Sequence, residues 1–94
     1  MKKLKIIKKK AWPVLFEKVL SGKKKFDIRL ADFDIKEGNI LILEEYNPKT
    51  KQYTGRIIKK KVGYILSTKS MEKMYSKKEI EKYGFNIIQL EDDK

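Results

Sequence analysis

The chain has 94 residues, with 40% hydrophobic residues and a formal net charge of +11, which fits one small folded domain, residues 1–94, rather than a disordered basic tail. It contains neither cysteine nor histidine, which excludes disulfides, Cys/His zinc sites and histidine-activated nucleophiles, so we expect no metal and no cofactor. No apolar run reaches the length of a membrane span or resembles a signal peptide, which predicts a cytoplasmic protein without a membrane partner.

The first elements are predicted to be an edge strand and an amphipathic helix. Leu4 to Lys8 mix β-branched residues with lysines, as an edge strand guarded by charge does. In the following segment Trp12, Phe16 and Leu20 recur every four residues, a proline suits the first helical turn, and Gly22 suits the helix end. We interpret the aromatic residues of this helix as core rather than as a platform for stacking bases.

Three further strands are predicted in the middle of the chain. Lys25 to Leu30 alternates charged and apolar residues, which indicates a half-buried strand. Asn39 to Tyr46 is an apolar run that predicts a buried strand, and a hairpin loop opened by Asn-Pro leads into a strand from Arg56 to Leu66. The lysine triplet Lys59 to Lys61 breaks the alternation, so we expect a bulge or an exposed edge there.

The last third of the chain predicts a short helix and a final strand. Ser67 to Tyr75 reads as polar and irregular, Ser76 to Gly84 as one or two helical turns ended by glycine, and Phe85 to Glu91 as a strand. The order of elements predicts an α+β, mostly β domain: a small curved sheet closing as a barrel, with one main helix after the first strand and a short second helix.

A row of charged residues follows the predicted helix. Alternate side chains of a strand share a face, so Lys25, Asp27 and Arg29 are expected to line up, while Lys24 either faces the other way or lies in the loop just after the helix. A carboxylate flanked by cations suits a hydrogen-bond acceptor or an orienting group better than a general acid. The alternative is that this row is simply the solvated face of a strand in a lysine-rich protein.

The charge surplus favours a polyanion as partner, and nucleic acid is the leading class. All basic residues except Arg29 and Arg56 are lysine, which indicates a non-specific field rather than sequence readout. A lysine-rich, cysteine-free surface also suits proteins from hot environments, so the surplus serves either binding or thermal stability. The turn from Tyr53 to Arg56 combines an aromatic ring, a hydroxyl, a glycine and a guanidinium, which suits clamping a nucleotide or a plain hairpin turn.

The string GKKKFDIR, from Gly22 to Arg29, resembles the Gly-x-Lys-x-x-Glu-x-Arg signature of the ASCH domain family, a branch of the PUA-like β-barrel superfamily. Nearly the whole chain is similar to one bacterial and archaeal subgroup of small uncharacterised ASCH-like proteins. The segments that carry this similarity are LKI, WPVLFEKVLSGKKKFDIR, EGNILILEEYNP, YTGR, VGYIL and GFNIIQLE.

The resemblance implies a PUA-like barrel with a cleft between the first helix and the sheet that binds RNA or modified nucleosides. By the resemblance, Gly22 shapes the turn, Lys24 is the signature cation and Arg29 is the last signature position. Asp27 stands where the family commonly has Glu, so its carboxylate keeps the charge but has less reach.

Three functional hypotheses follow. The first is an RNA-binding module whose basic cleft selects a nucleotide through Lys24, Asp27, Arg29, Tyr53 and Arg56. The second is a small amidohydrolase acting on an N4-acylated cytidine or a similar modified nucleoside, as one ASCH-like branch does on N4-acetylcytidine, with Lys24 as base or electrostatic stabiliser and Asp27 orienting it. The threonine of that branch falls at Asp27, which has no hydroxyl, so the mechanism does not transfer unchanged. The third is a thermally adapted domain that binds another protein.

Overall fold

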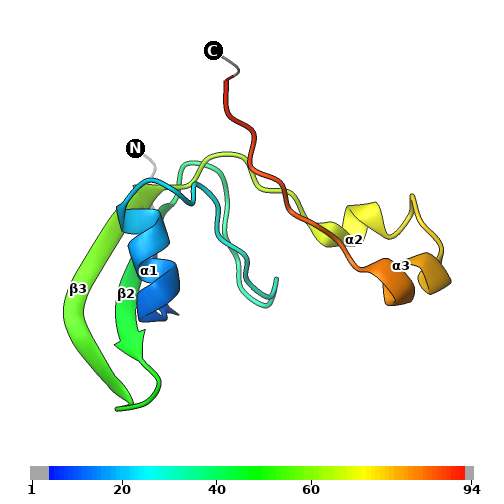
Figure 1. Ribbon diagram of the computed structural model, residues 1–94. Helices are drawn as coiled ribbons and strands as arrows, with labels where there is room; N and C mark the ends of the chain where they lie inside the picture. The colour runs from blue at the N-terminus through cyan, green and yellow to red at the C-terminus, as the bar shows by residue number, and fades with distance from the viewer. Residues whose placement is uncertain (1–4, 93–94) are drawn as a thin grey trace.

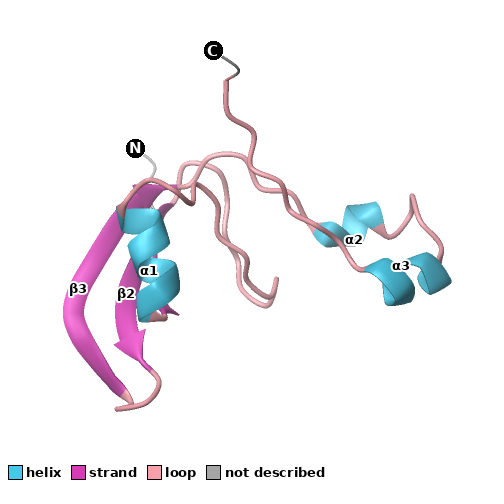
Figure 2. Cartoon of the chain, in the orientation of Figure 1, coloured by secondary structure: helices cyan, strands magenta, loops and turns pink. Residues whose placement is uncertain are grey.

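The computed structural model describes residues 5–92 and contains one sheet and three helices (Figure 1, Figure 2). In chain order the elements are β1 (Ile6–Ala11), α1 (Pro13–Leu20), β2 (Ile40–Asn47), β3 (Gln52–Lys61), α2 (Thr68–Met71) and α3 (Lys77–Tyr83). The predicted α+β class is confirmed, with more residues in strands than in helices.

The three strands form a mixed sheet in the order β1-β2-β3. β1 runs parallel to β2, with Ile7 opposite Leu41, and β3 runs antiparallel to β2, with Ile58 opposite Leu43. Among the described residues the sheet does not close on itself, so the expectation of a closed barrel is wrong. Closure needs a continuous ladder from the last strand back to the first, and here β1 and β3 are both edges.

The core lies where α1 covers one face of the sheet. Phe16 is the most deeply buried side chain, only 1% exposed, and packs among apolar side chains of all three strands. The other buried apolar members are Ile7, Ala11, Val19, Leu41, Leu43 and Ile58. Pro13 starts the helix without losing a hydrogen bond, because the first N–H groups of a helix have no partner within it. At the other end Ser21 caps the helix, and Gly22 follows it with a positive φ of 80°. The predicted helix is confirmed.

Two of the three residues that recur every four positions, however, are not core. Trp12 is 58% exposed and Leu20 is 52% exposed, although their spacing matches that of Phe16. Trp12 precedes the helix as its N-terminal cap residue, with extended backbone angles, so its ring leaves the apolar stripe. The interpretation of Trp12 as a core residue is therefore wrong.

Three segments predicted as strands are extended chain without a ladder: residues 25–30, 62–66 and 85–91. Each segment leaves an apolar side chain open to solvent, as the exposed fractions of Leu30 (80%), Tyr64 (82%) and Leu90 (88%) show, whereas Val62 packs against the core. Figure 2 draws all three as loops. An alternating sequence shows which side chains would share a face of a strand. A strand also needs a neighbouring strand to hydrogen-bond with, and the alternation carries no information about that neighbour.

β3 is an edge strand, and the lysine triplet at its end is exposed, as one of the two alternatives predicted. The irregularity of β3 lies at its other end. Glu44 faces Ile57 and Tyr46 faces Tyr53, so Glu45 alone stands opposite the three residues 54–56. Gly55 adopts a φ of 95° within this bulge, which a residue with a Cβ adopts only with strain.

The C-terminal third holds two short helices. Residues 67–75 were expected to be irregular, and α2 within them corrects that expectation: the Ser67 hydroxyl accepts a hydrogen bond from the Lys69 N–H at its start. α3 confirms the second predicted helix. Ser76 and Glu79 form a reciprocal capping box at its N-terminus, and these hydrogen bonds lower the pKa of the Glu79 carboxyl.

Replacing Ser76 by alanine is expected to cost α3 about 1 kcal/mol, because the N–H of Glu79 loses its acceptor. No residue of α3 is buried, so the loss is expected in local opening rather than in global unfolding. Amide hydrogen exchange of residues 77–83 measures it. Equal exchange in Ser76→Ala and the parent protein would contradict the role of the cap, and Ser76→Asp is expected to keep the protection.

None of the helices within residues 5–92 is long and apolar enough to cross a membrane.

Candidate functional site

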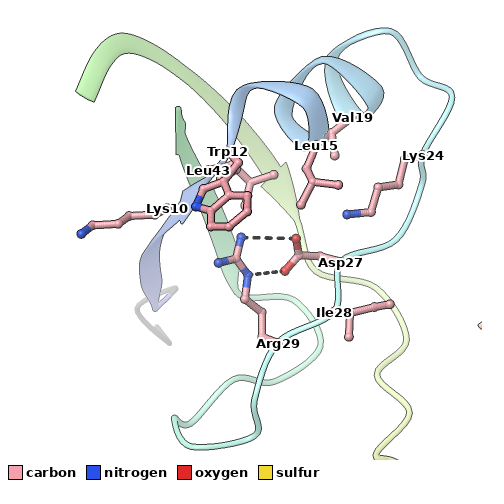
Figure 3. Close-up of a pocket in the computed structure, with 10 residues that line it drawn as sticks. Lys10, Trp12, Leu15, Val19, Lys24, Asp27, Ile28, Arg29 and Leu43 are labelled. Carbon is pink, nitrogen blue, oxygen red and sulfur yellow. Dashed lines mark hydrogen bonds and ion pairs between the residues drawn. The ribbon is translucent and has the colours of Figure 1, made fainter. Parts of the chain in front are cut away.

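A pocket of about 260 Å³ lies between α1, the end of β1 and the loop that follows the helix (Figure 3). Its lining combines apolar side chains from the helix and sheet with charged side chains from the loop and from β1. The lining residues are Lys10, Ala11, Trp12, Leu15, Val19, Lys24, Asp27, Ile28, Arg29 and Leu43. The structure therefore brings Lys24, Asp27 and Arg29 to one concave site, although their segment is not a strand.

The loop is held in place by backbone contacts on both sides of Lys24. The Lys24 N–H donates to the carbonyl of Lys18 in the last turn of α1, at 2.9 Å. One residue on, the Lys25 N–H donates to the side-chain carbonyl of Gln89. Lys25 is exposed and does not line the pocket, so it does not share a site with Asp27 and Arg29 as the row predicted.

Asp27 and Arg29 form an ion pair inside the pocket. Nε of Arg29 donates to Oδ2 of Asp27 at 2.7 Å, and an Nη donates to Oδ1 at 3.4 Å. Both side chains are largely buried, with 26% of Arg29 and 20% of Asp27 exposed. Since both carboxylate oxygens accept from Arg29, Asp27 orients the guanidinium, whose other N–H groups remain available as donors.

The pocket walls on either side of this pair differ in character. Figure 3 shows the Trp12 ring beside the pair, whereas the Lys24 ammonium points toward Asp27 from the other side. Trp12 was missed by the sequence reasoning because a spacing of four residues is the same for a core position and for the rim of a pocket. Its position directly before a proline at the helix start is the signal that would have separated them.

Arg56 does not line the pocket but forms ion pairs with Glu45 of the sheet and Glu17 of α1. Its Nε and Nη2 donate to the two oxygens of Glu45, each at 2.9 Å, and Nη2 also donates to Glu17 of α1. Thr54 donates its hydroxyl to Glu45 at 2.6 Å. The bulge at Gly55 explains this arrangement, because it places Thr54 and Arg56 together opposite the single residue Glu45.

Glu45 is a buried carboxylate, 4% exposed, on the core face of β2. The hydrogen bonds from Arg56 and then from Thr54 lower the pKa of Glu45 to about 2, and the same partnership raises the pKa of Arg56. The guanidinium carbon of Arg56 also lies 5.0 Å from the ring centre of Phe16. Arg56 therefore joins α1 to the sheet through Glu17, Glu45 and Phe16, while its side chain stays 47% exposed.

Tyr53 lies outside the pocket as well. It stands opposite Tyr46 in the sheet, and the two rings meet edge to face with centres 5.1 Å apart. The ammonium of Lys10 lies 4.2 Å from the ring centre of Tyr46 and 5.7 Å from that of Tyr53. Lys10 also lines the pocket, but Figure 3 shows its side chain running away from the Asp27–Arg29 pair.

Toward its centre the pocket offers the ammonium of Lys24, the oriented guanidinium of Arg29 and the indole ring of Trp12. Such a set suits a planar ring that carries a negative group, because the ring stacks on the indole while the cations hold the charge. Within residues 5–92, no group of three or more acidic residues is gathered as a metal site would require.

No curated protein matches the chain. The model of one family, described as Domain of unknown function (DUF3850), matches residues 3–77, which include the whole sheet, α1 and every residue that lines the pocket. Since this match covers most of the sequence, the chain belongs to the DUF3850 family.

Proposed function

We propose that this protein is a cytoplasmic RNA-binding module whose pocket holds one nucleotide of the RNA. The observation that carries the proposal is the convergence of Lys24, Asp27 and Arg29 with the exposed ring of Trp12 in one pocket. The net charge of +11 supplies the salt-dependent attraction to a polyanion that such a module needs. The resemblance of GKKKFDIR to the ASCH signature supports the same function, and we propose kinship with that family on this ground.

In this proposal each pocket residue has a separate task. Lys24 neutralises a phosphate, Arg29 donates to a phosphate or a base edge, and Asp27 fixes the plane of Arg29. Trp12 stacks against the base, as aromatic side chains do with unpaired nucleotides.

The test is to measure the affinity of a short RNA and of cytidine 5′-monophosphate across a salt series. The variant Lys24→Ala/Arg29→Ala is expected to lose about tenfold or more in affinity for the mononucleotide, because two charge-assisted contacts are removed. The matched control is Lys23→Ala/Lys25→Ala, which removes the same charge from exposed lysines next to the pocket. We expect the control to change the affinity by less than threefold.

Because Arg29→Ala leaves Asp27 without its partner, Lys24→Ala is measured alone as well. Equal affinities for the control and the pocket variant would contradict a role of the pocket in binding. They would show that the nucleotide is attracted only by the general positive charge. Incubation with N4-acetylcytidine provides a further readout. Turnover that depends on Lys24 would replace binding by hydrolysis as the function.

A further inference from the structure

The sheet has a second face, turned away from α1, and of its side chains only Lys10 also lines the pocket. Alternation along the strands defines this outer face, since the buried residues Ile7, Leu41, Leu43 and Ile58 all point to the helix. Figure 1 shows α1 on one side of the sheet, and no other described helix lies over the opposite side. The outer face consists of Ile6, Lys8 and Lys10 from β1, Ile40, Ile42, Glu44 and Tyr46 from β2, and Tyr53, Ile57, Lys59 and Lys61 from β3.

The outer face is open to solvent. Ile6 is 57% exposed, Ile57 is 59% exposed and Tyr53 is 52% exposed. The register places Lys8 and Lys59 on either side of Ile42, so the apolar centre of the face is flanked by cations on both edge strands. These flanking lysines argue against an apolar helix or sheet as the partner of this face. Covering the face with apolar side chains would remove water from the lysine ammonium groups, which is energetically costly.

The charge of the outer face is one-sided. Four lysines stand on it against one carboxylate, that of Glu44. They are distributed over β1 and β3, about 7 Å apart along each strand. A partner that covers this face must therefore be negatively charged along its length.

The aromatic pair identifies which polyanion fits. Tyr46 and Tyr53 lie at one end of the face, edge to face, with the Lys10 ammonium beside them. A duplex hides the faces of its bases in its own stack, whereas a single strand presents bases that stack on an exposed ring. An acidic protein segment matches the lysines but makes no use of the tyrosines.

We propose that the outer face binds single-stranded nucleic acid, with Tyr53 stacking against a base and Lys8, Lys10, Lys59 and Lys61 contacting the phosphates. This proposal rests on the proposed function and deepens it, because it states that the nucleic acid bound is single-stranded. The outer face shares only Lys10 with the pocket, so variants of the other residues test the two surfaces separately.

The experiment measures the affinity of labelled twelve-nucleotide oligouridine and oligothymidine, and of a duplex of the same length, across a salt series. We expect either single strand to bind more tightly than the duplex. Tyr53→Ala is expected to weaken single-strand binding about fivefold or more, and Tyr53→Phe to restore it, since the phenyl ring retains the stacking surface. Tyr83→Ala is the matched aromatic control, because Tyr83 is 73% exposed and also has a lysine, Lys82, over its ring.

The lysines are tested with Lys8→Gln/Lys59→Gln against Lys77→Gln/Lys78→Gln. Both variants lose the same charge, but the second pair lies on α3. Only the first is expected to reduce the slope of log affinity against log salt, by about 1. Equal binding of strand and duplex, equal effects of the two lysine pairs, or an acidic peptide that competes as well as the oligonucleotide would overturn the proposal. Mononucleotide affinity, measured on the same variants, reports on the pocket separately and is expected to be unchanged by Tyr53→Ala.

Discussion

Phe16→Ala is expected to lower the free energy of unfolding by roughly 3–5 kcal/mol, as truncation of a fully buried phenylalanine does. Phe16 is 1% exposed and belongs to the core cluster that α1 shares with all three strands of the sheet. Few neighbours are free to collapse into the resulting cavity, since the backbone around it is fixed by the ladder. For a domain of this size the loss is a large fraction of the total stability. Urea unfolding followed by circular dichroism measures it.

The control for this substitution is Val14→Ala on the same helix. Val14 is 71% exposed, so its truncation is expected to change the stability by less than about 0.5 kcal/mol. Phe16→Leu keeps most of the buried volume and is expected to fall between the two, which preserves a readout if the alanine variant does not fold. A loss for Phe16→Ala as small as the one expected for Val14→Ala would show that α1 contributes little to the core.

Arg56→Met is expected to lower the melting temperature by roughly 10 °C or more, because it leaves the buried carboxylate of Glu45 with Thr54 as its remaining donor. Removing one partner of a buried pair costs more than removing both, since the isolated charge keeps its desolvation penalty. Glu45→Met/Arg56→Met is therefore expected to recover much of the loss. If the double variant is less stable than either single variant, the contact of Arg56 with Phe16 matters more than the charge of Glu45.

The same pair gives the protein a defined sensitivity to acid. The pKa of Glu45 is about 2 in the folded chain against an ordinary value of 4.5, so the unfolded chain binds its proton more readily. The stabilisation from this group is complete above pH 4.5 and is lost as the pH falls from about 4.5 to about 2. Urea midpoints measured across that window are expected to fall more steeply for the parent protein than for Glu45→Gln. Identical slopes would contradict the assignment.

The elements that sequence reasoning located well are those whose signals are local. The proline and Gly22 delimit α1, and the serine cap and Gly84 delimit α3, because each end depends on a few neighbouring residues. The segments around Leu30, Tyr64 and Leu90 were misassigned for the opposite reason. Their alternation is as clear as that of a strand, but forming a ladder depends on an edge from elsewhere in the chain.

The candidate site divides in a similar way. Lys24, Asp27 and Arg29 were selected by the order of residues in one short string, and the structure places them in one pocket. Arg56 was selected by its neighbours in a turn, but the bulge at Gly55 places it against Glu45, outside the pocket. No local sequence pattern predicts toward which face of the sheet a bulge directs its side chains, because this depends on the residue opposite the bulge on the neighbouring strand.

The parallel pairing of β1 with β2 also determines at which stage of folding the pocket forms. A tight turn of residues 48–51 joins β2 to β3, whereas residues 12–39 separate β1 from β2 and include most of the pocket lining. The remaining wall is supplied by Lys10 and Ala11 of β1 and by Leu43 of β2, so the pocket is complete only once the crossover has closed against β2. Closing a long loop costs more conformational entropy than closing a hairpin. During synthesis on the ribosome, β1 cannot pair until β2 has emerged. Nearly half of the chain must be synthesised before the first nucleotide-sized space can form.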